Sequence, residues 1–442
     1  MKRRTFLEAA LAAAVVPRAL ACAAERAARE RPNIVLIMAD DLGYGDLGVT
    51  GRTDYATPAL DSLARDGVLL SQAYSIAPVC TPTRVGLMTG RYPARVRVGL
   101  YEPLTIQDFG LEPEPPTLPR LLRDAGYRTA HVGKWHLGTR TEFNPLRHGF
   151  DEFFGFRGAA IDYVTHANIE FEQHDWYEGE ERVVLEGYAT DLLTARAVDV
   201  IGRAGEPFFL NLQYNAPHWP WQAPGDPEFP DSLGWMRGGS NETFAGMMRS
   251  LDDGVGGVLD ALRRRGLDEN TLVVFTSDNG GERYSRMGPF RHGKMTVWEG
   301  GIRVAALARW PAAIAAGTRC DQVCSTLDWT ATFLAAADAQ PHPSAPLDGI
   351  DIMPQLTGTA APVARELFWR VHQRRQQKAV RSGDWKYIVD EQGEHLFHLA
   401  DDPGESRDRL ADSPEQRALL ATTLTAWEAN MLPPVPLVPT ER

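Results

Sequence analysis

Residues Asn33-Ile34-Val35-Leu36-Ile37-Met38 form a short run that is apolar without interruption from Ile34, and it continues into Ala39-Asp40-Asp41-Leu42-Gly43. Such a run predicts a strand that is buried on both faces of a parallel sheet. Two adjacent acids at the carboxyl end of a buried strand pack poorly, but that edge is where open α/β sheets bind ligands. Paired carboxylates suit a hard divalent cation. We therefore predict that Asp40 and Asp41 bind a metal ion, whereas Asp46 fits a solvated turn better.

Three more strand-like runs are followed by polar side chains. These runs span residues 127–132, 207–214 and 272–276. The polar residues after them, and one further downstream, are Lys134, His136, His218, Asp278, Asn279 and Lys294. Because the carboxyl ends of parallel strands meet at one edge of a sheet, we expect these side chains to share one site with Asp40 and Asp41. The Asp-Asn pair supplies oxygen ligands of the same hard kind as the first two acids.

Several other polar residues are better explained by packing or by exposure to solvent. His131 lies inside a predicted strand and is interpreted as a core histidine. His148 is interpreted as structural, and His292 is left without a role. Asp252-Asp253 falls in a helical stretch, residues 243–265, and is predicted to lie on its solvated face.

The segment Cys80-Thr81-Pro82-Thr83-Arg84 continues through Met88-Thr89-Gly90-Arg91 and has the features of a helix start that leads to a turn. The proline suits the first turn of a helix, and the arginine lies about one helical turn beyond the cysteine. A helix N-terminus favours negative charge, so a cysteine there suits a nucleophile that meets an anion. A buried structural cysteine is the alternative, and the local sequence does not separate the two.

The bulk composition is that of a soluble globular protein with room for one large domain and a smaller one. The chain has 442 residues, of which 43% are hydrophobic and 24% charged, with a formal net charge of -12. This charge excludes the basic surface typical of nucleic-acid binding. Its 4 cysteines are too few for a disulfide scaffold. Cys320 and Cys324 flank a predicted strand, along which they would lie about 13 Å apart, so we predict packed thiols.

Residues 1–30 are predicted to form a signal peptide and a charged linker. A basic start precedes an apolar stretch too short to span a bilayer, and small residues follow it. Arg3-Arg4-Thr5-Phe6-Leu7 resembles a twin-arginine export signal, with an ordinary basic start as the alternative. Ala19-Leu20-Ala21-Cys22 loosely resembles a lipoprotein cleavage box. We expect the export machinery to deliver the protein to the periplasm or the exterior, since no later segment is apolar enough to be transmembrane.

Helical and strand-like segments alternate along most of the chain, which predicts an α/β fold. Expected helices, besides 243–265, are residues 58–64 and 118–125, and residues 68–70 together with 73–74 are expected to form one strand. The alternation of helical and strand-like segments changes character around residues 356–364. Beyond this point the sequence predicts short antiparallel strands within 378–388 and 395–399, and a closing helix over 414–431. We therefore expect a catalytic domain over 31–360 and a C-terminal subdomain over 361–442.

Taken together, these motifs resemble the sulfatase family of the alkaline-phosphatase-like superfamily. The resemblance runs from about Asn33 to Leu396-Phe397-His398-Leu399-Ala400-Asp401-Asp402-Pro403-Gly404-Glu405, nearly the whole mature chain. Its most specific part is Cys80-Thr81-Pro82-Thr83-Arg84 with Thr89-Gly90-Arg91, although Thr83 stands where serine is commoner. The resemblance implies an α/β/α sandwich with a large, mostly parallel mixed sheet. It also implies a small C-terminal α+β subdomain with a short antiparallel sheet.

The resemblance further implies that a maturation enzyme oxidises Cys80 to formylglycine and that the protein binds one Ca²⁺ ion. By position, the metal ligands would be Asp40, Asp41, Asp278, Asn279 and a hydroxyl of the modified Cys80. In this scheme one hydroxyl of the hydrated aldehyde attacks sulfur and displaces the alcohol. Loss of the other hydroxyl's proton then expels sulfate and regenerates the aldehyde.

The remaining catalytic roles implied by the resemblance fall on basic residues. Arg84 and Lys134 would neutralise the nucleophile and the sulfate oxygens. His136 would take the proton of the second hydroxyl. His218 and Lys294 would contact the sulfate and protonate the leaving oxygen, as general acids do.

The expected activity is hydrolysis of a sulfate monoester, either an aryl sulfate or a sulfated carbohydrate. The main alternative is a phosphonate or phosphate ester hydrolase of the same superfamily. A non-catalytic sulfated-glycan binder is disfavoured, because every expected catalytic position is filled, and a two-zinc phosphatase would need Ser or Thr at Cys80. Substrate choice is expected to depend on loops around residues 101–110, 156–181 and 219–237, whose aromatic residues fit either sugar stacking or a core.

Overall fold

The computed structural model describes residues 31–436 except 106–108, 169–172, 206, 229–235 and 237. The predicted signal peptide and the Cys22 cleavage box lie outside the described residues. None of the helices in the described part of the chain combines the length and apolar character needed to cross a membrane.

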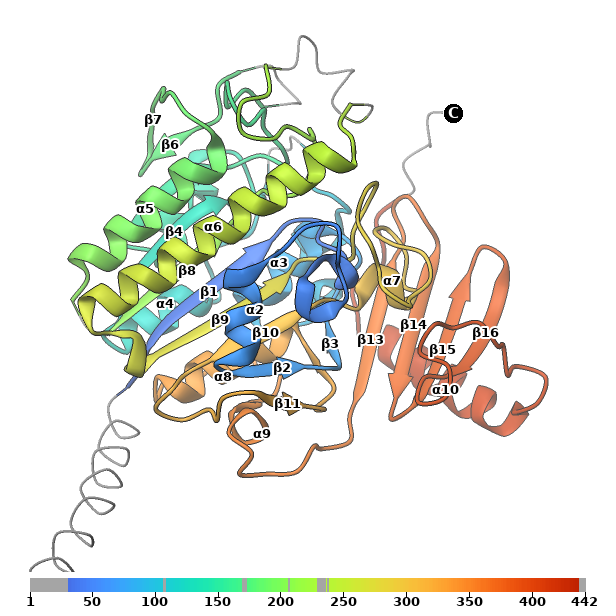
Figure 1. Ribbon diagram of the computed structural model, residues 1–442. Helices are drawn as coiled ribbons and strands as arrows, with labels where there is room; N and C mark the ends of the chain where they lie inside the picture. The colour runs from blue at the N-terminus through green and yellow to red at the C-terminus, as the bar shows by residue number, and fades with distance from the viewer. Residues whose placement is uncertain are drawn as a thin grey trace, which may run out of the picture.

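Among the described residues, a 10-stranded sheet runs through the larger part of the molecule (Figure 1). Its parallel strands are, in spatial order, β9 (Thr271–Ser277), β1 (Asn33–Ala39), β8 (Phe208–Gln213), β4 (Arg128–Lys134) and β5 (Glu152–Phe156). Beyond β9 lie the antiparallel β10 (Ala306–Arg309), then β2 (Val68–Leu70) and β11 (Thr318–Cys320), and beyond β5 lie β6 (Tyr177–Glu178) and β7 (Glu181–Arg182). The predicted large, mostly parallel mixed sheet is therefore confirmed.

Helices cover both faces of this sheet (Figure 1). One face carries α2 (Pro58–Arg65), α5 (Ala189–Arg203) and α6 (Asn241–Arg265), and the other carries α3 (Cys80–Thr89), α4 (Leu118–Asp124), α8 (Thr326–Ala336) and α9 (Met353–Leu356). Strand β1 contributes to both cores, because Val35 and Ile37 face one layer while Leu36 and Met38 face the other. A strand between two helix layers needs apolar side chains on both faces, which explains its uninterrupted apolar run.

Short elements complete the larger part. They are α7 (Glu299–Ile302), the parallel pair β3 (Ala73–Tyr74) and β12 (Cys324–Ser325), and 3-10 turns at Tyr44–Asp46, Gly48–Thr50, Pro93–Arg95, Arg97–Leu100, Thr141–Phe143, Pro145–His148 and Asp268–Asn270. The predicted strand between Cys320 and Cys324 is wrong, because β11 ends at the first cysteine and β12 begins at the second. The two cysteines are buried free thiols, as predicted.

The C-terminal part is an antiparallel sheet of four strands in chain order, packed on both faces (Figure 1). These are β13 (Glu366–Val371), β14 (Gln377–Ser382), β15 (Trp385–Asp390) and β16 (Gly393–His398). Helix α10 (Pro414–Glu428) covers one face through Leu420, Leu424 and Trp427. The other face packs Trp369 and Phe397 against Tyr74 and Cys80 of the larger part. The small sheet therefore packs against the start of α3.

The histidine expected in the core is buried there, and two acids that were expected in solvent are buried as well. His131 is buried among aromatic rings and meets Asn211 at 2.9 Å, as predicted for a core histidine. Asp46 is fully buried rather than solvated, because it accepts hydrogen bonds from the Arg52 guanidinium at 2.7 Å and from the backbone N–H of Arg286 at 2.8 Å. This carboxylate therefore ties the loop after β1 to a segment 240 residues away.

Asp252 is the second acid that differs from expectation. Asp253 is exposed as predicted, but Asp252 is buried. The Asp252 carboxylate accepts hydrogen bonds from the backbone N–H groups of Ala59 and Leu60, at 3.1 and 2.8 Å. It satisfies donors of the first turn of α2, which have no partner within their own helix. The polar stripe of α6 could not reveal this, because the donors belong to another helix.

Candidate active site

Strand ends bring the predicted site residues together at one edge of the large sheet. Asp40 and Asp41 follow β1, and Asp278 follows β9. Met38 pairs with both Thr276 and Gln213, so the three central strands end level with one another. The carboxyl ends therefore present their side chains to the same space.

The centre of the site is a buried cluster of acids and cations. The Asp40 carboxylate pairs with the Lys134 ammonium and lies 3.5 Å from the Arg84 guanidinium. Arg84 also donates to Asp278 at 2.9 Å. Burial opposes ionisation of Asp40, but the positive charges of Lys134 and Arg84 hold its pKa well below the usual range. Burial, and then the charge of Asp40, raises the pKa of Asp278 to about 7.

Asp41 links a second group of residues to this cluster. Its carboxylate accepts a 2.7 Å bond from Lys294 and a 2.8 Å bond from the Asn279 amide. Its backbone N–H donates to the Asp278 carboxylate at 3.2 Å. The φ angle of Asp41 is 64°, in the left-handed region. That conformation, uncommon for a residue other than glycine, turns the chain between two adjacent acids.

The oxygen donors at this edge fit a divalent cation. Within the described residues, Asp40 Oδ1 and Asn279 Oδ1 are buried and have no hydrogen-bond partner. Ligand atoms of Asp40, Cys80 and Asp278 lie within 4.8 Å of one another, as do those of Asp40, Asp41 and His218. Buried polar atoms without partners are rare in native proteins, so these oxygens point to a bound ligand. Carboxylate and amide oxygens suit a hard cation such as Ca²⁺.

Two neutral histidines flank the acids. His218 Nδ1 donates to the Trp219 carbonyl at 2.5 Å, and His218 Nε2 lies 3.6 Å from Asp41. His136 Nε2 contacts the Leu104 carbonyl at 2.9 Å. Burial lowers the pKa of His218 to about 3, and burial together with the positive charge of Lys134 lowers that of His136 well below its usual value. Each ring therefore keeps one nitrogen with a free lone pair.

Cys80 is the first residue of α3 and is 2% exposed. Burial raises the pKa of its thiol to about 11, so the unmodified side chain is a neutral thiol at neutral pH. Arg84 lies on the next turn of the helix, where its guanidinium also donates to Gln213 at 2.9 Å. The predicted site residues thus come from α3, four strand ends and the loop of Lys294.

Comparison with known proteins shows the family of this chain. The family model Sulfatase matches residues 32–339. Mouse (Mus musculus) N-acetylgalactosamine-6-sulfatase is 38% identical over 358 residues, which cover 74% of this chain and 67% of the relative. The chain belongs to the sulfatase family. Human (Homo sapiens) arylsulfatase A is 36% identical over 422 residues, covering 87% of this chain and 80% of that protein.

Solved structures resemble the sulfatase over most of its length. The crystal structure of Ps i-CgsB matches with a TM-score of 0.84 and 31% identity, and covers 93% of this chain and 96% of that one. Ps i-CgsB has also been solved in complex with k-i-k-neocarrahexaose. The phosphonate monoester hydrolase of Agrobacterium radiobacter has a TM-score of 0.65 at 20% identity, which shows a shared fold. The sulfatase is an enzyme that hydrolyses sulfate esters, with an alkaline-phosphatase-like fold.

Sequence analysis missed two groups that hold the site of the sulfatase in place. Gln213 is the last residue of β8 and accepts the hydrogen bond from Arg84, and its own amide donates to Asn211 at 2.6 Å. The Leu104 carbonyl that meets His136 is the other. Two polar residues on one strand flanked by apolar neighbours were a signal for Gln213. A backbone carbonyl leaves no such signal in the sequence.

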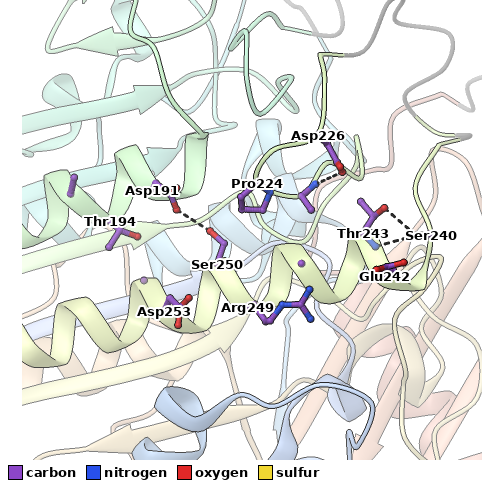
Figure 2. A pocket seen from close by; sticks show the side chains of 14 residues that line it. Asp191, Thr194, Pro224, Asp226, Ser240, Glu242, Thr243, Arg249, Ser250 and Asp253 are labelled. Atoms are coloured by element: carbon purple, nitrogen blue, oxygen red, sulfur yellow. Dashed lines mark hydrogen bonds between the residues drawn. The ribbon is translucent and has the colours of Figure 1, made fainter.

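The aromatic residues expected near the substrate divide into two kinds. Tyr163 and Trp176 are fully buried and belong to the core, whereas Trp219 is partly exposed beside His218. Phe171 and Trp235 lie outside the described residues. A cavity of about 870 Å³ lies elsewhere in the sulfatase, between α5, α6 and residues 223–226, where Figure 2 shows Asp191 facing Ser250. Its lining contains none of the predicted site residues that the structure describes.

Proposed function

We propose that this sulfatase cleaves a sulfate monoester with a formylglycine derived from Cys80 and one bound Ca²⁺ ion. The observation that carries the proposal is the position of Cys80, whose sulfur lies within 4.8 Å of carboxylate oxygens of Asp40 and Asp278. A hydrated aldehyde at this position supplies one hydroxyl to attack the sulfur and a second whose deprotonation releases sulfate.

The metal ligands we propose are Asp40, Asp41, Asp278, Asn279 and the modified Cys80. The unpartnered oxygens of Asp40 and Asn279 support this set. When bound, Ca²⁺ supplies a Lewis acid that polarises an oxygen of the sulfate group.

The basic residues have separate roles in this proposal. Arg84 and Lys134, both buried beside Asp40, offset the negative charge of the nucleophile and of the sulfate oxygens. His136 is neutral and accepts the proton of the second hydroxyl. His218 and Lys294 both lie beside Asp41 and bind the sulfate. The Lys294 ammonium carries a proton for the leaving oxygen, whereas neutral His218 delivers one only after the negative charge of the bound sulfate ester has raised its pKa.

The class of substrate we propose is a sulfated carbohydrate. The names of the relatives support it, since one is an N-acetylgalactosamine-6-sulfatase and Ps i-CgsB has been solved with a neocarrahexaose. The partly exposed Trp219 next to His218 offers a ring for stacking on a sugar. An aryl sulfate is the simpler substrate on which the chemistry can be measured.

We also propose that the protein is exported by its N-terminal signal and divides near residue 360 into a catalytic domain and a C-terminal subdomain. The packing of α10 on the four-stranded sheet supports a separate C-terminal unit. The maturation enzyme must meet Cys80 before folding buries it against that unit, so oxidation precedes completion of the fold.

Turnover of an aryl sulfate and of a matched aryl phosphonate ester distinguishes the proposal from its main alternative. Mass spectrometry of the Cys80 peptide first establishes conversion of the thiol to the aldehyde. We expect kcat/KM for the sulfate to exceed that for the phosphonate by at least about tenfold, a difference of about 1.4 kcal/mol in transition-state binding. A preference for the phosphonate, or a mature enzyme whose Cys80 remains a thiol, contradicts the proposal.

Calcium is expected to stabilise the folded protein as well as to support activity. Protein treated with a chelator should show a lower Tm, and free Ca²⁺ at a hundred times its Kd should restore about 2.7 kcal/mol of stability. Asp40→Asn should abolish most of this shift, whereas Asp253→Asn, an exposed acid on α6, should retain it. Differential scanning calorimetry across a Ca²⁺ titration measures the response. A Ca²⁺ response of Asp40→Asn equal to that of the wild type contradicts the metal site.

A further inference from the structure

The backbone of Leu104 connects Thr81, next to Cys80, with His136 of the proposed site. Its N–H donates to Thr81 Oγ1 at 3.0 Å, and its carbonyl lies 2.9 Å from His136 Nε2. Thr81 follows Cys80 directly on α3, and both Thr81 and Leu104 are buried. The backbone of this one residue therefore links the start of α3 to the imidazole of His136.

Glu102 attaches this segment to the C-terminal part. The Glu102 carboxylate Oε2 accepts hydrogen bonds from the backbone N–H groups of His372 and Gln373, at 2.7 and 2.8 Å. In return, the N–H of Glu102 donates to the side-chain oxygen of Gln373 at 2.8 Å. Glu102 is 5% exposed. Three bonds thus connect Glu102 to the loop after β13, two residues before the peptide that meets His136.

The contact with Leu104 determines which nitrogen of His136 carries the proton. A carbonyl oxygen only accepts hydrogen bonds, so His136 Nε2 must be the protonated nitrogen of the neutral ring. Nδ1 then holds the lone pair, and within the described residues it is buried without a hydrogen-bond partner. The charged groups that act on the ring are Lys134, Arg84 and Asp40, all at the centre of the site. Nδ1 is therefore the nitrogen able to accept a proton there.

We propose that Glu102 is a positioning residue that holds His136 in the Nε2–H tautomer through Leu104, with Nδ1 as the basic nitrogen. The inference rests on the proposed function of His136. Orientation of a catalytic imidazole by a hydrogen bond to its other nitrogen is a general requirement for a base of fixed tautomer. Here the acceptor is a backbone carbonyl, and its position depends on a carboxylate held by the C-terminal part.

Steady-state kinetics of Glu102 variants test the role in catalysis. In Glu102→Ala the segment loses its acceptor for two N–H groups, so we expect kcat per folded molecule to fall about 10–100-fold, as for other residues that orient a catalytic group, with KM changed less than about twofold. Glu102→Gln retains an acceptor oxygen and should recover most of the lost kcat. The matched control is Asp252→Ala, which also removes a buried carboxylate that accepts two backbone N–H bonds, but far along the chain on α6. This control should lower the Tm and leave kcat unchanged.

Nitrogen NMR of labelled histidine tests the tautomer without any need for turnover. The His136 signals, assigned by their loss in His136→Gln, should show a protonated Nε2 and an unprotonated Nδ1 in the wild type. In Glu102→Ala we expect the two nitrogen shifts to move toward each other as the tautomers exchange. Gln373→Ala removes only the side-chain oxygen that accepts the Glu102 N–H, and it does so in a partly exposed loop. This variant should move the two nitrogen shifts in the same direction. It replaces Glu102→Ala in the experiment if Glu102→Ala does not fold.

The kinetic and NMR results together decide whether Glu102 positions His136. Unchanged kcat and unchanged His136 signals in Glu102→Ala, or in Gln373→Ala if that variant replaces it, overturn the positioning role. A Glu102→Gln variant as impaired as Glu102→Ala also overturns it, since the retained oxygen should suffice. A wild-type enzyme without sulfate ester turnover overturns the proposed function instead. In that case the NMR signals alone decide whether Glu102 fixes the tautomer.

Discussion

Replacing Cys80 with serine is expected to leave an enzyme that accepts sulfate once and then stops. The serine hydroxyl can form a bond to sulfur while the bond from sulfur to the leaving oxygen breaks, with the proton passing to that oxygen. The resulting ester has no second hydroxyl on the same carbon, so deprotonation cannot expel the sulfate. We expect multiple turnover to fall about 10⁴-fold, the scale seen when one member of a catalytic triad is changed.

The Cys80→Ser experiment has two readouts. One equivalent of alcohol should appear per enzyme molecule in the first turnover, and intact-protein mass spectrometry should show one added sulfate group. Cys320→Ser is the matched control, because it makes the same thiol-to-hydroxyl change at another buried cysteine outside the site, and it should turn over normally. Undiminished multiple turnover by Cys80→Ser would show that a hydrated aldehyde is not needed.

The sequence was a good guide to the position of the site because its geometry follows from parallel strands. Strand β1 is apolar after Asn33, so the acids at its end stand out against it. Neighbouring strands of a parallel sheet end at the same edge, and this places Asp278 beside Asp40 without any knowledge of the loops. The sequence was a weaker guide to the cations that pair with these acids. Pairing of Lys134 with Asp40 depends on β8 lying between their two strands, a spatial order that the sequence does not contain.

Burial of individual charged residues was the feature that the sequence predicted least well. Asp46 and Asp252 were both expected in solvent, and both are buried because distant segments supply donors to them. Lys386 is a buried charge about which the sequence analysis made no prediction. It lies on β15 between two large side chains, and alternation along a strand does not reveal whether its face meets water or another sheet. In the structure that face packs against the larger part, and Lys386 is fully buried.

Lys386 sits between two carboxylates at the junction of the two parts of the molecule. Its ammonium lies 2.8 Å from Glu299 of α7 and 2.8 Å from Glu405. Glu299 also accepts bonds from Arg303 at 2.9 Å and from the Tyr74 hydroxyl at 2.8 Å. Burial opposes ionisation of Glu299, but the positive charge of Lys386, followed by that of Arg303, lowers its pKa to about 2. All three members of the Glu–Lys–Glu group are therefore charged or hydrogen-bonded without access to water.

Lys386→Met is accordingly expected to destabilise the protein strongly. It preserves most of the side-chain volume but leaves Glu299 and Glu405 facing each other without the cation, and breaking a buried pair costs about 3–5 kcal/mol. Lys378→Met is the matched control on the neighbouring strand β14, where the Lys378–Glu428 pair of 2.6 Å is about one-third exposed. Exposed pairs contribute about 0–1 kcal/mol, so this variant should remain close to the wild type. Urea unfolding of both variants compares the two losses directly.

The Glu299–Lys386–Glu405 group is also connected to the segment that carries Lys294. Glu405 accepts the backbone N–H of Glu299 at 2.6 Å, and Glu299 begins α7 five residues after Lys294, whose ammonium meets Asp41. Loss of the cation therefore loosens the segment that delivers Lys294 to the site as well as the junction between the two parts. We expect Lys386→Met to raise KM for an aryl sulfate at temperatures where it is still folded, while Lys378→Met leaves KM unchanged. Equal stabilities of the two variants would show instead that Glu299 and Glu405 become protonated or reach water when the lysine is absent.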